Sequence, residues 1–196
     1  MSTVMRTYKA KMVDLMRFSV NDVNRFDIAH SLARINRWNG HTREPISVGQ
    51  HSVECSRFGA TPREQMALLL HDAHEAYVGD FTRPQFDLIV AIVREVAGEA
   101  AAELFRERWK TLLKHMDKTI CQALGVPYDW PDSIYDIDDR MLLTEGQQQL
   151  DLLPIEVGPK LARLEPLNCD VRGWRPDLAT DRWQARFIEL HQLVTR

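Results

Sequence analysis

The fold prediction depends on one stretch, Leu68-Leu69-Leu70-His71-Asp72-Ala73-His74-Glu75-Ala76-Tyr77-Val78-Gly79-Asp80. The three leucines suit a buried helix, whereas an imidazole beside a carboxylate needs polar partners or a bound cation there. Glu75 lies four residues after His71 and therefore shares its helix face. We expect Gly79 to end this helix, with Asp80 in the turn that follows. The stretch thus predicts one helix that supplies two candidate metal ligands, His71 and Asp72, together with two further carboxylates.

The composition is that of an ordinary globular protein. The chain has 196 residues, of which 44% are hydrophobic and 27% charged, so we expect one soluble domain, residues 1–196. A net charge of -3 gives no general attraction to nucleic acid. No apolar run is long enough to cross a bilayer, and no signal-peptide core is recognisable near the N-terminus. The three cysteines lack paired spacing. We therefore expect a cytoplasmic protein (in the host cytoplasm if the chain is viral) with neither a nucleic-acid nor a membrane partner.

Apolar residues recur at helical spacing along most of the chain, which predicts an all-α fold. The expected helices cover residues 26–38, 48–55, 61–78, 86–115, 118–124, 133–150 and 178–194. Thr61-Pro62-Arg63-Glu64 has the cap, the proline and the glutamate of a good helix start. Prolines and glycines predict loops through most of residues 151–178. On the last helix, Trp183, Phe187, Leu190 and Val194 form a stripe expected in the core.

Two histidines and two carboxylates could close one metal site. The candidates are His51, His71, Asp72 and a carboxylate from the helix near residue 139. Imidazole and carboxylate ligands suit zinc, cobalt, manganese or iron, and a set without cysteine argues against a closed structural zinc site. Such a set leaves coordination positions for a water molecule, as a hydrolytic metal requires.

Each of these residues also has a plainer interpretation. A single histidine such as His51 is more often a surface or core residue than a ligand, and Asp138 and Asp139 could form a solvated helix face. Arg37 would usually be surface charge and Trp38 would usually be core. The spacing of His74 and Glu75 does not match the HExxH motif of metalloproteases.

The pattern nevertheless resembles the HD-domain phosphohydrolase superfamily, whose H…HD…D motif lies on separate helices. Here the motif is met by His51, by His71-Asp72 and by Asp139. Asp139 is preferred over Asp138 because the segment Asp139–Glu145 follows the family's pattern after its last aspartate. The resemblance covers roughly residues 26–150 and implies a single HD-domain helical bundle, with residues 151–196 as a C-terminal loop and helix.

Within this superfamily, the chain most resembles the small nucleotide hydrolases. In the bacterial 5'-deoxynucleotidases an Arg-Trp pair contacts the substrate, and Arg37-Trp38 matches that pair. The catalytic glutamate and aspartate of these enzymes fall on Glu75 and Asp80. Residues 26–52 look most like the phage and prophage branch, which includes viral dATP triphosphohydrolases. The chain departs from its relatives after Asp80, because the turn 81–86 contains Arg83 in place of a lysine.

The resemblance implies a hydrolase that uses Co²⁺, Zn²⁺ or Mn²⁺ and acts on a small deoxynucleotide, in a protein expected to form homo-oligomers. One interpretation is a dNTP triphosphohydrolase, favoured for dATP by the phage-like segment, in which Arg83 contacts the outer phosphates. The other is a 5'-deoxynucleotidase that cleaves dNMPs, favoured by the missing lysine. A third interpretation, a non-catalytic nucleotide sensor, does not explain why both Glu75 and Asp80 are present.

Overall fold

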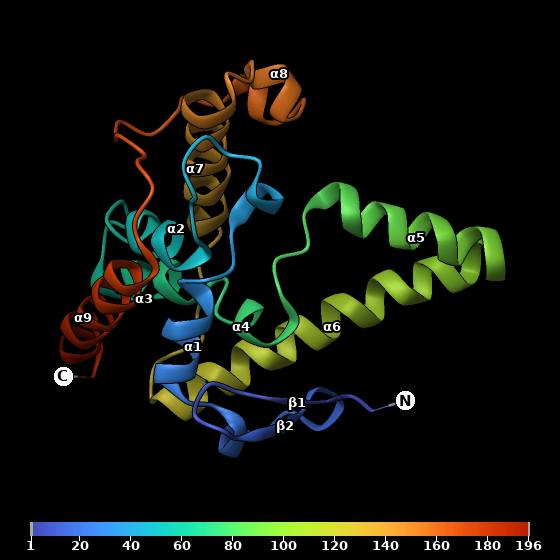
Figure 1. The fold of residues 1–196 in the computed structure, drawn as a ribbon, viewed down its shortest axis with the longest axis horizontal. Helices are drawn as coiled ribbons and strands as arrows, with labels where there is room; N and C mark the ends of the chain where they lie inside the picture. Colours follow the sequence, from blue (N-terminus) through green and yellow to red (C-terminus); the bar gives the residue numbers. More distant parts are fainter. Residues whose placement is uncertain (1, 196) are drawn as a thin grey trace.

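Helices form most of the chain in the computed structural model, which describes residues 2–195 (Figure 1). The α-helices are α1 (Arg25–Leu32), α2 (Val48–Cys55), α3 (Pro62–Leu70), α4 (Glu75–Val78), α5 (Arg83–Ala97), α6 (Glu99–Leu124), α7 (Ser133–Leu150), α8 (Pro154–Val157) and α9 (Pro176–Val194). Short 3-10 helices are η1 (Leu15–Arg17), η2 (Val20–Asp22), η3 (Arg37–Gly40) and η4 (Leu161–Arg163). The all-α prediction is confirmed in its coarser part, because the described chain is mostly α-helical.

The main body is organised around the last helix. Helix α9 packs against α1, α2 and α3. Its stripe faces the core, where Trp183 and Leu190 are fully buried and Phe187 is nearly so. Burying large apolar side chains of this kind stabilises a fold by roughly 1.5–3 kcal/mol each. The predicted stripe is therefore part of the core. Helix α9 packs against α2, which carries His51, and against α3, which ends just before His71.

Two expected helices have other boundaries in the structure. The helix expected over residues 26–38 ends at Leu32, and Arg37–Gly40 forms η3 instead. The prediction of one long helix over residues 86–115 is wrong, because Gly98 has a φ of 88° and separates α5 from α6. Helix α6 then continues without interruption to Leu124, through the segment expected to be a separate helix. Helices α5 and α6 form a hairpin that projects from the body (Figure 1).

A small sheet corrects the all-α prediction. Strands β1 (Val4–Arg6) and β2 (Met12–Asp14) pair antiparallel, with Met5 opposite Val13. Three residues per strand are too few for an alternating pattern to be recognised in the sequence. None of the helices described in residues 2–195 is both long enough and apolar enough to cross a membrane.

The stretch quoted at the outset forms two helices and not one. Helix α3 ends at Leu70, a turn carries residues 71–74, and α4 begins at Glu75. Gly79 ends α4 with a φ of 84°, as expected for the residue after a helix. His71 and Asp72 therefore lie on a tight turn at the end of a buried helix.

Candidate active site

Two buried imidazoles point their Nε2 atoms at the same place. The side chain of Ser47 caps α2, which carries His51, while His71 follows the end of α3. His51 Nδ1 lies 2.8 Å from Glu145 Oε1, and His71 Nδ1 lies 2.8 Å from the carbonyl oxygen of Leu68. When each Nδ1 donates its proton to these oxygens, both Nε2 atoms are free to bind a metal. The two Nε2 atoms are 3.3 Å apart.

Two carboxylates approach this imidazole pair. Asp138 Oδ1 lies 3.1 Å from His51 Nε2 and 3.6 Å from His71 Nε2. Asp72 Oδ2 lies 3.1 Å from His71 Nε2 and 3.7 Å from His51 Nε2. Atoms that bind one ion at roughly 2.0–2.2 Å must lie roughly 3–4 Å apart. The ligand atoms of His51, His71 and Asp138 all lie within 4.8 Å of one another, so this group could hold a divalent ion.

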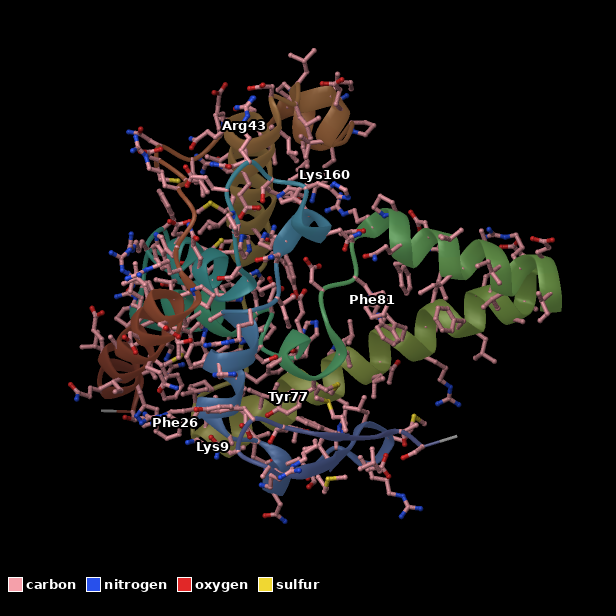
Figure 2. All side chains as sticks on the ribbon, viewed as in Figure 1. Lys9, Phe26, Arg43, Tyr77, Phe81 and Lys160 are labelled. Atoms are coloured by element: carbon pink, nitrogen blue, oxygen red, sulfur yellow. The ribbon has the colours of Figure 1, made fainter. Side chains whose placement is uncertain are left out.

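The choice of Asp139 as the last ligand is wrong. Its carboxylate forms ion pairs with Arg83, at 3.1 Å, and with Lys160, which is labelled in Figure 2. Neighbouring residues of an α-helix point about 100° apart, so only one of the adjacent Asp138 and Asp139 on α7 can face the imidazoles. The structure places Asp138 there.

The charges of this group favour a cation at its centre. Burial alone would lower the pKa of His71, but Asp72 and Asp138 raise it well above 6.5. Burial alone would likewise raise the pKa of Asp72, but His71 lowers it to about 2. Protons on the imidazoles thus balance the carboxylates, and a divalent ion supplies the same kind of charge. Metal binding must therefore compete with protons.

Glu145 joins the imidazole pair to the turn that carries Arg37 and Trp38. Arg37 Nε donates to Glu145 Oε2 at 2.9 Å, and Trp38 Nε1 donates to the same oxygen at 3.1 Å. With His51, this fully buried carboxylate has three partners. No role for Glu145 was predicted from the sequence. Glu145 lies seven residues after Asp138, about two helical turns along the same face of α7, and this spacing could have indicated that it lies near the imidazoles.

The turn at Arg37 and Trp38 has an unusual backbone. Trp38 has a φ of 55° and Asn39 a φ of 52°, and positive values are rare for a bulky side chain. The close fit around Trp38 also involves Gly146, where an added Cβ would lie 3.3 Å from the Trp38 ring. Arg37 is 8% exposed. The fold therefore holds this pair in one orientation, despite the local strain.

A cavity of about 550 Å³ brings together the residues predicted to be catalytic or to bind the substrate. Its lining includes Arg37, Trp38, Asp72, Glu75, Asp80, Arg83 and Asp138. The Oε2 atom of Glu75 is buried without a hydrogen-bond partner among the described residues. Burial, with Asp72 and Asp80 nearby, raises the pKa of Glu75 well above 4.5. Burial is also the main reason that the pKa of Asp80 is raised. Both carboxyl groups therefore keep their protons to a higher pH than a free carboxyl group does.

Fold and site together define a mostly α-helical protein with a histidine–carboxylate group suited to a divalent ion. No family model matches the chain. An uncharacterized protein of Rhodobacter capsulatus is 36% identical over 87 residues, which covers 40% of this chain and 44% of that protein. The uncharacterized protein YfdR of Escherichia coli is 38% identical over 80 residues, with the same shares of each chain covered. The matches thus span less than half the length of these relatives, and their names indicate no activity.

Proposed function

We propose that this chain is a metal-dependent phosphohydrolase of the HD-domain type that acts on 2'-deoxyribonucleoside 5'-phosphates. The observation that carries the proposal is the convergence of residues far apart in the sequence. His51, His71, Asp72 and Asp138 meet next to one cavity, and Arg37, Glu75 and Asp80 line that cavity. Metal ligands, a phosphate-binding guanidinium and carboxylates for proton transfer are the groups that phosphate ester hydrolysis requires.

A divalent ion held by the two imidazoles and two carboxylates would lower the pKa of a bound water molecule and offset phosphate charge. Arg37, held through its Nε by Glu145, turns its remaining N–H groups toward the phosphate. Its Nη1 lies 3.8 Å from Asp72 Oδ2, which places the guanidinium beside the candidate ligands.

Glu75 and Asp80 handle the protons of the reaction. The oxygen of a water molecule bonds to the α-phosphorus, the bond from this phosphorus to the 5' oxygen breaks, and a proton from the water is finally held by the 5' oxygen. Glu75 orients or deprotonates the water, and Asp80 positions the water or the sugar. Trp38 lies against the sugar or base, where an aromatic face binds with limited chemical selectivity.

The leading form of the proposal is a dNTP triphosphohydrolase that acts on dATP and releases deoxyadenosine and triphosphate. The alternative is a 5'-deoxynucleotidase that acts on dNMPs. It is favoured by the pairing of Arg83 with Asp139, because this contact occupies the one candidate for outer phosphates that the sequence offered on turn 81–86.

Product analysis tests the proposal. The purified chain is incubated with each dNTP and each dNMP in the presence of Co²⁺, Zn²⁺ or Mn²⁺, and the nucleoside, phosphate and triphosphate products are separated. We expect deoxyadenosine and intact triphosphate from dATP, with no dADP or dAMP accumulating. Efficient cleavage of dAMP with dATP left intact would select the nucleotidase form. If no substrate releases a nucleoside with any of the metals, hydrolysis is rejected and the non-catalytic nucleotide sensor is the remaining interpretation.

A further inference from the structure

A second cavity reaches the same candidate metal ligands from the side of α6. This α6 cavity has a volume of about 870 Å³. Its lining includes His71, Asp72 and Asp138, and also Arg106, Lys110 and Lys114 of α6. Asp72 and Asp138 also line the cavity that contains Arg37 and Trp38, here called the Arg37 cavity. The candidate metal group is therefore open to two cavities, and the proposed function so far uses only one.

The cations of the α6 cavity form a row. Arg106, Lys110 and Lys114 are spaced four residues apart, so they share one face of α6. Within residues 2–195, Lys110 and Lys114 form no ion pair with a carboxylate, while Arg106 lies 3.2 Å from Asp87. Both lysines are exposed. Their charge is thus available to a ligand in the cavity.

The carboxylates of the α6 cavity outside the candidate metal group are mostly engaged elsewhere. Asp117 accepts a hydrogen bond from His74 at 2.8 Å, and Asp129 forms an ion pair with Arg63 at 3.0 Å. Asp132, beside the start of α7, also lines the cavity. Among the described residues outside the candidate metal group, the charged side chains of this cavity that lack an ion-pair partner are two lysines and one aspartate. Their net charge is therefore positive.

The Arg37 cavity has the opposite character. Its two arginines are already neutralised, Arg37 by Glu145 and Arg83 by Asp139. Beyond the metal ligands, its lining includes the carboxylates Glu75, Asp80 and Glu156. The β- and γ-phosphates would find no unpaired arginine there among the described residues, whereas the hydroxyl groups of a neutral nucleoside can donate hydrogen bonds to these carboxyl groups. The two cavities therefore suit different ends of a nucleotide.

We propose that the α6 cavity binds the β- and γ-phosphates of a nucleoside triphosphate, through Lys110 and Lys114 with support from Arg106. This inference rests on the proposed function, because the α-phosphate would bind the divalent ion that the shared ligands Asp72 and Asp138 would hold. The nucleoside then occupies the Arg37 cavity. Phe81, which lines the Arg37 cavity, packs edge to face against Trp109, which lines the α6 cavity, with ring centroids 5.4 Å apart. The α6 row supplies the cations for the outer phosphates, and it makes the substrate a triphosphate.

The test is the double variant Lys110→Ala/Lys114→Ala in the full-length, metal-loaded protein. Both side chains are exposed, so the fold has little to lose from their removal. We expect kcat/KM for dATP to fall at least about tenfold, through KM, while kcat/KM for dAMP changes less than about twofold. Binding of inorganic tripolyphosphate, measured by calorimetry, should weaken by a similar factor. The matched control is Arg108→Ala, which removes an exposed cation of α6 that does not line this cavity.

Three results would overturn the proposal: equal losses for dATP and dAMP, no loss for either, or the same loss in Arg108→Ala. A triphosphate-selective loss in Arg83→Ala, with the double variant normal, would move the outer phosphates to the Arg37 cavity. Failure of the proposed function is recognised separately, because the wild-type chain would then hydrolyse neither nucleotide. Tripolyphosphate binding still decides the α6 site in that case, since unchanged affinity in the double variant rejects it.

Discussion

Glu145 and Glu75 are carboxylates near the same imidazole pair, but their surroundings differ. Glu145 is fully buried and accepts hydrogen bonds from three side chains. Burial would raise its pKa, yet Arg37 and His51 lower it below 4.5. Glu75 has a buried oxygen without a partner in the described chain, and burial raises its pKa. A fully partnered carboxylate holds other groups in place, whereas an unpartnered one facing a cavity is free to exchange protons.

The same contrast applies to the two adjacent aspartates of α7, Asp138 and Asp139, and it gives the largest expected effect. Asp138 faces the imidazoles, whereas Asp139 faces Arg83 and Lys160. Asp138→Ala should abolish turnover and weaken Zn²⁺ or Co²⁺ binding at least about a hundredfold, because one ligand is lost and the buried imidazoles lose a counter-charge. Asp139→Ala should retain metal affinity. Calorimetric metal titration of both variants decides between them, and a normal titration for Asp138→Ala would restore Asp139 as the ligand.

Replacing the unpartnered glutamate should slow the reaction without emptying the metal site. Glu75→Gln keeps the shape of the side chain but cannot take a proton, so kcat should fall by roughly 10²–10⁴. Metal affinity should stay within a few-fold of wild type. Steady-state kinetics and metal titration are measured on the same preparation. Loss of the metal with kcat per bound metal unchanged would mean that Glu75 is a ligand.

Replacing the fully partnered glutamate should have a smaller effect that involves several residues. Glu145→Gln can still accept a hydrogen bond from His51 Nδ1, but it removes the negative charge that holds Arg37 and Trp38. We expect a loss of about 10–100-fold in metal affinity or kcat/KM, as is typical for groups that orient metal ligands. Glu145→Asp, which restores the charge at a shorter reach, should recover part of it. A variant with unchanged kinetics and only a lower Tm would limit Glu145 to stabilising the fold.

The sequence predicted the parts of the site that depend on local patterns. The caps of α2 and α3 place His51 and His71, and Gly79 ends α4 as expected. The selection of Asp139 failed because two adjacent aspartates differ only in which face of α7 they occupy, and tertiary packing decides which face is turned inward. The resemblance could not replace that information.

Other features depended on contacts between distant residues, which no local pattern records. The helix break at Gly98 is not predictable from the local pattern, because a glycine within a helical pattern is often tolerated. The role of Glu145 comes from contacts with residues about a hundred positions away. The α6 cavity likewise forms only when the α5–α6 hairpin folds back beside the metal group.

A third buried glutamate allows the smallest-scale test of the contrast, through the pH dependence of stability. Glu54 lies one turn after His51 on α2 and is 6% exposed, with Gln50 as its side-chain partner. Burial raises its pKa from 4.5 to about 7. Between these values the folded protein keeps a proton that the unfolded chain has released, so the free energy of unfolding falls as pH rises. Above pH 7 the total loss is on the order of 3 kcal/mol at most, from about 1.4 kcal/mol for each pH unit.

The variant Glu54→Gln tests this pH dependence, because its side chain has no such proton to lose. In the presence of a chelator, its urea midpoint should exceed that of wild type increasingly from pH 5 to pH 7, with the difference constant above that. Glu103→Gln, which removes an exposed carboxylate of α6, is the matched control and should follow the wild-type curve. A Glu54→Gln curve parallel to wild type over this range would show that Glu54 is ionised in the folded protein, and burial alone would then not distinguish it from Glu145.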